Sequence, residues 1–250
     1  MLHAAFGVCP PRLMLSQRPL DQTKGILMPT SHFLQINEIM QLITLTNPNR
    51  LLDIGVGFGK YGFLSREYLE LWDGRQKYDD WKRRIDGIEA FKEYLTPVHD
   101  FIYDKVFIGN AVDILPTIAE EYDLILLVDV LEHFDYSNGL KLLQECETHG
   151  RNILISVPKR VMSQGCAFGN PCETHRFQWK KSHFLKFKNK FFLLNVHDSL
   201  IIYIGEDART ISQKIKKRRF RQTILLFRKT IVRMLEFIHL KNHMRRLLNR

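Results

Sequence analysis

The segment LLDIGVGFGKYGFL contains two overlapping glycine patterns that suit different ligands. Gly57, Gly59 and Gly62 form a G-x-G-x-x-G sequence, which is typical of loops that bind a nicotinamide or flavin dinucleotide. The second pattern begins with an acid, because Asp53 is followed by glycine at every second position, at Gly55, Gly57 and Gly59. In both patterns the glycines let the backbone approach a ligand, and the next helix directs its N-terminus at that ligand.

The position of the preceding strand favours the acidic pattern. In a dinucleotide-binding loop the first glycine directly follows an apolar strand. Here the strand predicted from the segment RLLDIG ends at Gly55, two residues before Gly57, and carries Asp53 near its end. A carboxylate at this edge would repel a pyrophosphate but attract a cation. We therefore expect a cationic ligand that carries no phosphate.

Further candidate site residues lie where other predicted strands end. Glu89 closes the segment RIDGIE, Asn110 and Ala111 follow VFIG, and Asp129 follows the apolar run DLILLV. A carboxylate at the position of Asp129 would carry a desolvation cost without a partner or water, so we expect it to face a crevice. Glu89 lies 36 residues after Asp53, against ~20 in compact dinucleotide folds, and we interpret the excess as a longer first helix with an extended loop.

Two histidines are candidates for catalysis. His133 follows Asp129 by four residues, and a general base is one interpretation because the pKa of histidine lies near neutral pH. The other interpretation is a structural histidine. His175 lies in the segment CETHRFQW after the fifth predicted strand, where it, Glu173 and Arg176 could orient or deprotonate a substrate. The alternative for this segment is a lid held by surface polar contacts.

Metal-binding patterns are weak in the sequence. Cys166, Cys172, His175 and His183 could be combined into a zinc site. However, Cys166 and Cys172 are spaced more widely than the usual pair of zinc-binding cysteines, and the sequence has no second such pair. We therefore expect no metal site. A divalent ion held by carboxylates and histidines near the crevice remains an alternative, with the candidate ligands Glu132, His133 and Glu173.

The order of the predicted elements indicates the fold class. From Leu51 to Pro158 short apolar strands alternate with helices, and five such units in a row imply a parallel, doubly wound sheet. Two strands then follow each other directly, in the segments FFLLNVHDS and LIIYIGE, and should form an antiparallel hairpin. We predict an α/β fold with a doubly wound, mostly parallel seven-stranded sheet, a C-terminal antiparallel hairpin and a basic helical tail.

The chain divides into three predicted segments. Residues 1–27 show no sustained periodicity, so we expect a disordered leader, or an untranslated stretch if Met28 is the true start. Residues 28–208 form the predicted domain, which begins with an amphipathic helix capped by Ser31. A further helix is expected over the segment KKSHFLKFKN, before the hairpin. Residues 209–250 form the predicted basic amphipathic helical tail.

Composition excludes several classes of protein. The 250 residues are 45% hydrophobic and 26% charged, which is ordinary for a soluble globular protein. No apolar run approaches the ~20 residues that a membrane span needs, and the first residues lack the features of a secretory signal. The four cysteines form no C-x-x-C pair, which indicates a reduced environment. We expect a cytoplasmic protein, with a peripheral membrane location as an alternative.

The net charge of +10 is concentrated in the tail. Residues 211–250 contain 13 lysines and arginines against one acid and carry +12, so the other 210 residues sum to −2. Three partners remain open for this segment: its own domain or a second subunit, an anionic membrane surface, and, less favoured, RNA. The oligomeric state remains open. Apolar residues recur at steps of three and four residues between the lysines and arginines of this segment: Phe220, Ile224, Phe227, Ile231, Met234, Leu235 and Ile238.

Together these segments resemble the class I S-adenosylmethionine-dependent methyltransferases. The segment DIGVGFG, which begins at Asp53, is similar to the first motif of that family, and GNAVD, from Gly109, is similar to the segment that meets the adenine. DLILLVDVLEHF resembles the fourth motif of the branch that acts on small molecules and glycans, and ILISVPK resembles the fifth strand. The resemblance covers roughly residues 30–206, and the hairpin is what this family adds to a doubly wound sheet.

The resemblance implies S-adenosylmethionine as the cofactor and assigns its contacts. Glu89 stands where the family binds both ribose hydroxyls, Asn110 and Ala111 stand on the adenine side, and Asp129 would face the sulfonium and amino group. The implied cofactor-binding residues are Asp53, Gly55, Gly57, Gly59, Glu89, Asn110, Ala111 and Asp129.

The implied activity is transfer of a methyl group to an oxygen or nitrogen of a small molecule or a glycan or lipid-linked saccharide, with His133 and His175 as catalytic candidates. The alternatives are methylation of RNA, helped by the basic tail, and a cofactor-binding scaffold without catalysis.

Overall fold

The computed structural model describes residues 31, 33–71, 77, 80–160, 169–194, 196 and 198–248, without the side chains of 226, 232 and 235–248. The predicted leader, residues 1–27, and the proposed start at Met28 lie outside the described residues.

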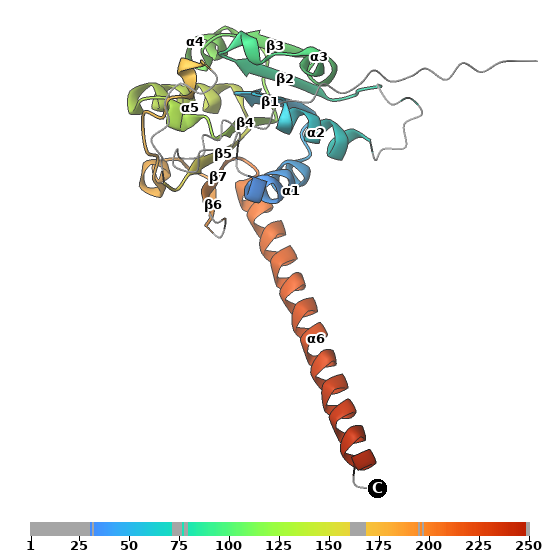
Figure 1. Ribbon diagram of the computed structural model, residues 1–250. Coiled ribbons are helices and arrows are strands. Elements are labelled where there is room, and N and C mark those ends of the chain that lie inside the picture. The colour runs from blue at the N-terminus through green and yellow to red at the C-terminus, as the bar shows by residue number, and fades with distance from the viewer. Residues whose placement is uncertain are drawn as a thin grey trace, which may run out of the picture.

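A single seven-stranded sheet forms the centre of the described chain (Figure 1). Its strands lie in the order β3-β2-β1-β4-β5-β7-β6, in which the first five are parallel and β7 runs antiparallel to both β5 and β6. The predicted fold class is therefore confirmed, including the closing hairpin. The strand bounds are β1 Arg50–Ile54, β2 Arg84–Glu89, β3 Lys105–Ile108, β4 Leu124–Val128, β5 Asn152–Pro158, β6 Lys190–Leu193 and β7 Ser199–Gly205.

Helices cover both faces of this sheet. Neighbouring residues of β4 point to opposite faces, so that Ile125 and Leu127 join one apolar cluster and Leu124 and Leu126 the other. The first cluster includes buried residues of α4 and α5, and the second includes those of α1, α3 and α6. Strands buried on both faces explain why their sequences are continuous apolar runs. The α-helices are α1 Ile36–Thr46, α2 Lys60–Glu70, α3 Pro97–Ile102, α4 Ala111–Ile114, α5 Tyr136–His149 and α6 Ala208–Leu248, and the short 3₁₀ turns are η1 Phe33–Gln35, η2 Lys92–Tyr94, η3 Leu115–Thr117, η4 Leu131–His133, η5 Pro171–Glu173 and η6 Lys181–Phe184.

Two local predictions are wrong. Ser31 does not cap α1, which follows the turn η1 and has Gln35 at its N-cap position without a side-chain cap bond. The helix predicted over KKSHFLKFKN is only the turn η6. The last residue of this turn, Phe184, is buried, and the buried Phe187 follows outside the turn. The strand that follows begins at Lys190 and is shorter than predicted.

The helix α6 has two parts with different surroundings. Its first two turns contact α1, β6 and β7 and bury Ala208, Ile211 and Ile215 in the second cluster. Beyond them the helix projects away from the domain (Figure 1), and its described apolar side chains are exposed, from Phe220 at 67% to Met234 at 60%. The tail therefore begins structurally after Ile215. No helix of the described residues is long and apolar enough to cross a membrane.

A buried ion pair fixes α2 beside the edge of the sheet. The guanidinium of Arg66 donates to Glu70 at 2.7 Å and to Asp104 at 2.8 Å, and its Nε donates to the backbone carbonyl of Ile102. The carboxylate of Glu70 also accepts from the backbone N–H of Lys82 at 2.7 Å. This network joins α2 to the residues just before β2 and to Ile102 and Asp104, which precede β3.

We predict that Glu70→Gln lowers the free energy of unfolding by about 3 kcal/mol, the lower end for a broken buried pair because Asp104 still contacts the guanidinium. Urea denaturation measures the change. The control is Arg151→Gln, because Arg151 pairs with Glu206 at the surface, where 52% and 71% of the two side chains are exposed, and such pairs contribute about 1 kcal/mol at most. Equal denaturation midpoints for the two variants would contradict the prediction.

Candidate active site

A cavity of about 1190 Å³ opens at the carboxyl ends of the parallel strands. It is lined by the loop after β1, the ends of β2, β4 and β5, the start of α4, the turn η4 and the segment around η5. Most of the predicted site residues line it: Gly55, Gly57, Glu89, Asn110, Ala111, Asp129, His133 and His175. Asp53 and Gly59 do not. Tertiary structure thus brings residues from five separate segments to one cavity.

The glycine loop is held by its own hydrogen bonds. The N–H of Gly55 donates to the carbonyl of Ile88 at 2.8 Å, and the N–H of Gly59 donates to that of Val56. Gly55 has a φ of +76°, and a Cβ built on it would lie 2.6 Å from a methyl of Val130. A side chain at this position would therefore be both strained and too close to its neighbour.

Glu89 fastens this loop to the end of β2. One oxygen of its carboxylate accepts from the N–H of Gly57 at 3.0 Å, and the other accepts from the N–H of Phe91 at 2.9 Å. Glu89 is buried and also lines the cavity. An ionised carboxylate has about four acceptor positions, so it can accept from ligand hydroxyls while keeping both backbone bonds.

Asp53 lies behind the loop rather than at the cavity surface. Its carboxylate accepts a hydrogen bond from the hydroxyl of Tyr103 at 2.7 Å. Gly62, the last glycine of the dinucleotide pattern, makes room for the same tyrosine ring, which a Cβ would overlap. Burial raises the pKa of Asp53 to about 7. The direct cofactor contact predicted for Asp53 stays a prediction. The hydrogen bond from Tyr103 supports the loop on the side away from the cavity.

Asn110 and Ala111 form the start of α4. The side-chain oxygen of Asn110 accepts from the N–H of Val112 at 3.1 Å, which makes Asn110 the cap of this helix. Ala111 is buried and follows it at the cavity wall. The side chain of Asn110 thus has a structural role beside any contact with a ligand.

Asp129 is held by buried polar partners at the end of β4. It has a φ of +55°, and its carboxylate accepts from the side-chain amide of Gln35 at 2.6 Å and from the hydroxyl of Ser156 at 3.1 Å. Burial raises its pKa to about 6, against the opposing effects of these bonds and of Lys60. The ammonium of Lys60 in turn donates to the hydroxyl of Ser31 at 2.9 Å.

The segment after η5 is fixed to η4 by hydrogen bonds and packing. The backbone carbonyl of Glu132 accepts from the N–H of Arg176 at 2.7 Å, and the indole of Trp179 donates to the carbonyl of Leu131 at 2.9 Å. Trp179 is 1% exposed and lies directly against Gly139 of α5, with no room for a Cβ there. This segment is therefore anchored in the core, unlike the lid held by surface contacts that the sequence left open.

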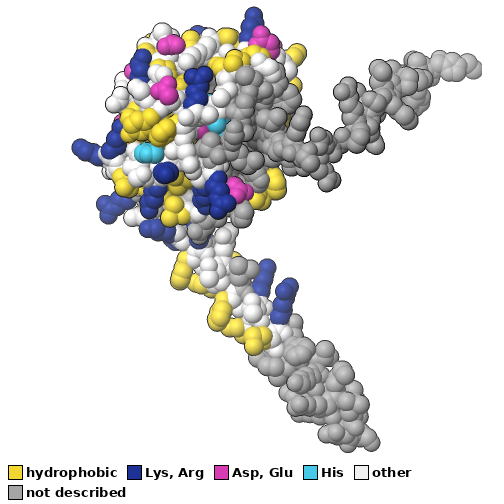
Figure 2. All heavy atoms as spheres, turned by 60° about the vertical axis from the view of Figure 1, so that its left-hand side comes forward, with side chains coloured by type: hydrophobic (Ala, Val, Ile, Leu, Met, Phe, Trp, Pro, Cys, Tyr) yellow, Lys and Arg dark blue, Asp and Glu magenta, His cyan; other side chains and the backbone are white. Residues whose placement is uncertain are grey.

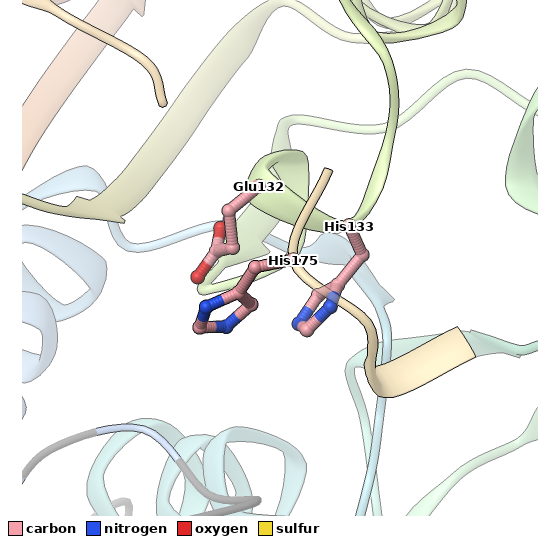
Figure 3. Close-up of side chains that lie close together, drawn as sticks. All are labelled: Glu132, His133 and His175. Carbon is pink, nitrogen blue, oxygen red and sulfur yellow. The ribbon is translucent and has the colours of Figure 1, made fainter. Parts of the chain in front are cut away.

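This anchoring brings three potential ligand groups together (Figure 3). Glu132 and His133 come from η4 and His175 from the anchored segment, and the imidazole ring centroids are 5.0 Å apart. Burial raises the pKa of Glu132 well above its usual range, and burial followed by the charge of His175 lowers the pKa of His133 to about 4. Glu173, which the sequence grouped with Glu132 and His133, instead accepts from the hydroxyl of Tyr94 at 2.9 Å.

Sequence reasoning missed several polar residues of the site. Gln35, Ser31 and Lys60 lie at or behind the cavity wall beside Asp129, although they come from η1, the residues before it and α2. Gln35 carried no usable signal, because its burial and its bond to Asp129 appear only in the folded protein. Tyr94 and Tyr103 carried no signal, since their partners are 79 and 50 residues away.

We predict that Asp53 makes stability depend on pH. Between about pH 4 and pH 7 its carboxyl is protonated in the folded protein and ionised in the unfolded chain. The folded state binds more protons there, so the free energy of unfolding falls as pH rises, by up to about 1.4 kcal/mol per pH unit. Denaturation across this range should give a shallower slope for Asp53→Asn than for wild type. The exposed control Asp100→Asn should keep the wild-type slope, and identical slopes for all three proteins would refute the prediction.

Comparison with known proteins adds a set of distant structural likenesses. No family model and no curated protein matches the chain. A protein from Nostoc punctiforme PCC 73102 that is assigned as an O-methyltransferase shares 14% identity with a TM-score of 0.48, over 69% of this chain and 57% of that one. A methyltransferase from Geobacter sulfurreducens shares 12% identity with a TM-score of 0.48, over 71% and 82%. An rRNA methylase from Escherichia coli shares 14% identity with a TM-score of 0.44, over 69% and 64%.

The fold itself is established by the sheet. Five parallel strands with the reversal between β1 and β4, the glycine loop after β1, and an antiparallel β7 inserted between β5 and β6 form one arrangement. This chain therefore has the Rossmann-like fold of the class I S-adenosylmethionine-dependent methyltransferases.

Proposed function

We propose that this protein is a methyltransferase that uses S-adenosylmethionine. The observation that carries the proposal is the hydrogen bond from the N–H of Gly57 to the carboxylate of Glu89. A pyrophosphate would need the N–H groups of this loop, but Gly55, Gly57 and Gly59 already donate to partners within the protein. A dinucleotide would also meet the negative charge of Glu89. A nucleoside that carries a sulfonium cation has neither difficulty.

The contacts proposed for the cofactor follow the cavity wall. Glu89 accepts from the ribose hydroxyls, Asn110 and Ala111 border the adenine, and Asp129 faces the sulfonium and the amino group. These four residues all line the cavity. Asp53 has an indirect role in this proposal, because it binds Tyr103 behind the glycine loop. The volume of about 1190 Å³ exceeds the roughly 300–1,000 Å³ of a typical ligand pocket, which supports room for an acceptor beside the cofactor.

The proposed acceptor is an oxygen or nitrogen of a small molecule or a glycan-type substrate. Methyl transfer is an in-line displacement at a sulfonium, in which the protein contributes alignment and a site from which water is excluded. His133 and His175, proposed as catalytic residues, line the same cavity as Asp129. Their position beside the cofactor site supports a role toward the acceptor.

We predict that S-adenosylhomocysteine binds in calorimetry and that NAD does not. Glu89→Gln should weaken this binding about 10- to 100-fold, as expected for loss of a hydrogen bond that involves a charged group. The control is Glu93→Gln, because Glu93 is an exposed acid in the nearby turn η2. Tighter binding of NAD than of S-adenosylhomocysteine would overturn the proposed function.

Two other functions remain as outcomes of turnover assays. Methyl transfer to RNA but not to a metabolite pool would favour an RNA methyltransferase. Cofactor binding without turnover on either would favour a non-catalytic scaffold.

We also propose that the projecting part of α6 binds an anionic membrane surface. Apolar side chains lie along one edge of this helix and basic side chains along the opposite edge (Figure 2). Five exposed apolar residues with described side chains form a stripe at steps of three and four, Phe220, Ile224, Phe227, Ile231 and Met234, whereas the exposed Leu225 lies outside it. Such a stripe flanked by lysines and arginines suits the boundary of an anionic bilayer.

A paired coiled coil is the less favourable partner for the same stripe. The steps of four and three residues also match a heptad, in which Arg221 and Arg228 would flank the seam. Residues 211–250 contain one acid, Glu236, to offset 13 basic residues. Two copies side by side would therefore repel, whereas anionic lipid would neutralise the charge.

We predict that the protein sediments with vesicles of phosphatidylserine and phosphatidylcholine, and less so as salt rises, because salt screens the attraction. Truncation after Lys217 keeps the buried Ile211 and Ile215 and should abolish sedimentation without loss of cofactor binding. Phe220→Ser combined with Phe227→Ser keeps every charge and should weaken binding at least tenfold if the stripe enters the bilayer. Binding to RNA but not to vesicles, or concentration-dependent dimers, would refute the membrane proposal.

A further inference from the structure

We propose that Glu132, His133 and His175 bind a divalent transition-metal ion at the acceptor end of the cavity. The proposal rests on the proposed methyltransferase function only for the role of the ion, because the geometry of the three side chains is independent of it. It differs from the sequence-based expectation of no metal site.

The three side chains are already close. One ligand atom from each lies within 4.8 Å of the others, whereas ligands of a single ion with bonds near 2.1 Å lie roughly 3 to 4 Å apart. Figure 3 shows the carboxylate of Glu132 and both imidazoles directed into one space. Small side-chain rotations would close the site.

Two of the three groups have an unused atom in a buried position. Oε2 of Glu132 and Nδ1 of His133 are buried without a hydrogen-bond partner among the described residues. Glu132 is 2% exposed, and a carboxylate buried in this way is costly unless a cation or donor faces it. A divalent ion held by these side chains would offset the cost of burying the carboxylate of Glu132.

The neighbouring acids are occupied elsewhere. Both oxygens of Asp129 accept from Gln35 or Ser156, and Glu173 accepts from Tyr94. The candidate set is therefore two imidazoles and one carboxylate, with the remaining positions open to the cavity. Imidazole ligands favour first-row transition ions, whereas magnesium and calcium take oxygen ligands.

An ion here would explain how an acceptor hydroxyl reacts. A hydroxyl bound to a divalent ion has a lowered pKa and releases its proton to water. Its oxygen then forms a bond to the methyl carbon as the carbon–sulfur bond breaks, and the electron pair of that bond stays on sulfur. The products are a methyl ether and S-adenosylhomocysteine. This role of the ion applies to a hydroxyl acceptor, whose proton the ion would help to release.

The test is a titration of the full chain with Co²⁺ after treatment with a chelator, followed by visible absorption. We expect one equivalent to bind, Zn²⁺ to displace it, and millimolar Mg²⁺ to leave it in place. Glu132→Gln and His175→Ala should each weaken Co²⁺ binding at least tenfold. The matched control is His149→Ala, because His149 lies 4.0 Å from Glu145 in a similar acid–histidine pair on α5 but belongs to no such three-residue cluster among the described residues.

Binding of S-adenosylhomocysteine by each variant separates the two proposals. Variants that lose Co²⁺ but keep S-adenosylhomocysteine binding are folded and support the metal site. Absence of Co²⁺ and Zn²⁺ binding in a wild-type protein that binds S-adenosylhomocysteine overturns the metal site alone. Co²⁺ binding that depends on His149 as much as on His175 also overturns it. Metal binding without any S-adenosylhomocysteine binding would instead overturn the proposed function and leave the metal site standing.

Discussion

The hydrogen bond between Glu89 and the backbone of Gly57 is the interaction on which the ligand site depends. It joins the end of β2 to the loop after β1 and uses the N–H group that a phosphate would need. The same carboxylate places negative charge at the cavity wall. This contact fixes the conformation of the glycine loop together with the backbone bonds of Gly55 and Gly59, and its carboxylate is the reason that we propose a cationic ligand. The buried carboxyl of Asp53 lies behind the loop and accepts a hydrogen bond from Tyr103.

The acceptor side depends on a different contact, in which the segment after η5 lies against η4. The bond from Trp179 to Leu131 and the packing of the indole on Gly139 place His175 beside Glu132. Core packing thus positions the side chains for which we propose a role toward the acceptor. Side chains held on packed elements are placed more accurately than those on loops, which both a catalytic and a metal-binding role require.

The helix α6 shows how one element can serve two environments. Ile211 and Ile215 are buried in the domain, whereas the next apolar residues, from Phe220, are exposed. The first part belongs to the stable fold, and the second has an apolar stripe that the domain does not cover. Its excess of basic residues makes an anionic partner electrostatically favourable, and this surface lies apart from the cavity that we propose for catalysis.

The sequence by itself determined the fold class and the polar residues at the strand ends. Period-two and continuous apolar patterns depend on local burial, and parallel strands must bring their carboxyl ends to one edge, so the positions of Glu89 and Asp129 at the cavity followed directly. Only the tertiary structure decided which polar groups pair across long separations. In the folded protein Asp53 binds Tyr103 behind the cavity surface. His175, rather than the expected Glu173, lies in the cluster with Glu132 and His133. The reason is physical: a hydrogen bond or a ligand cluster depends on distances in space, and residues far apart in the chain leave no periodic pattern that records those distances.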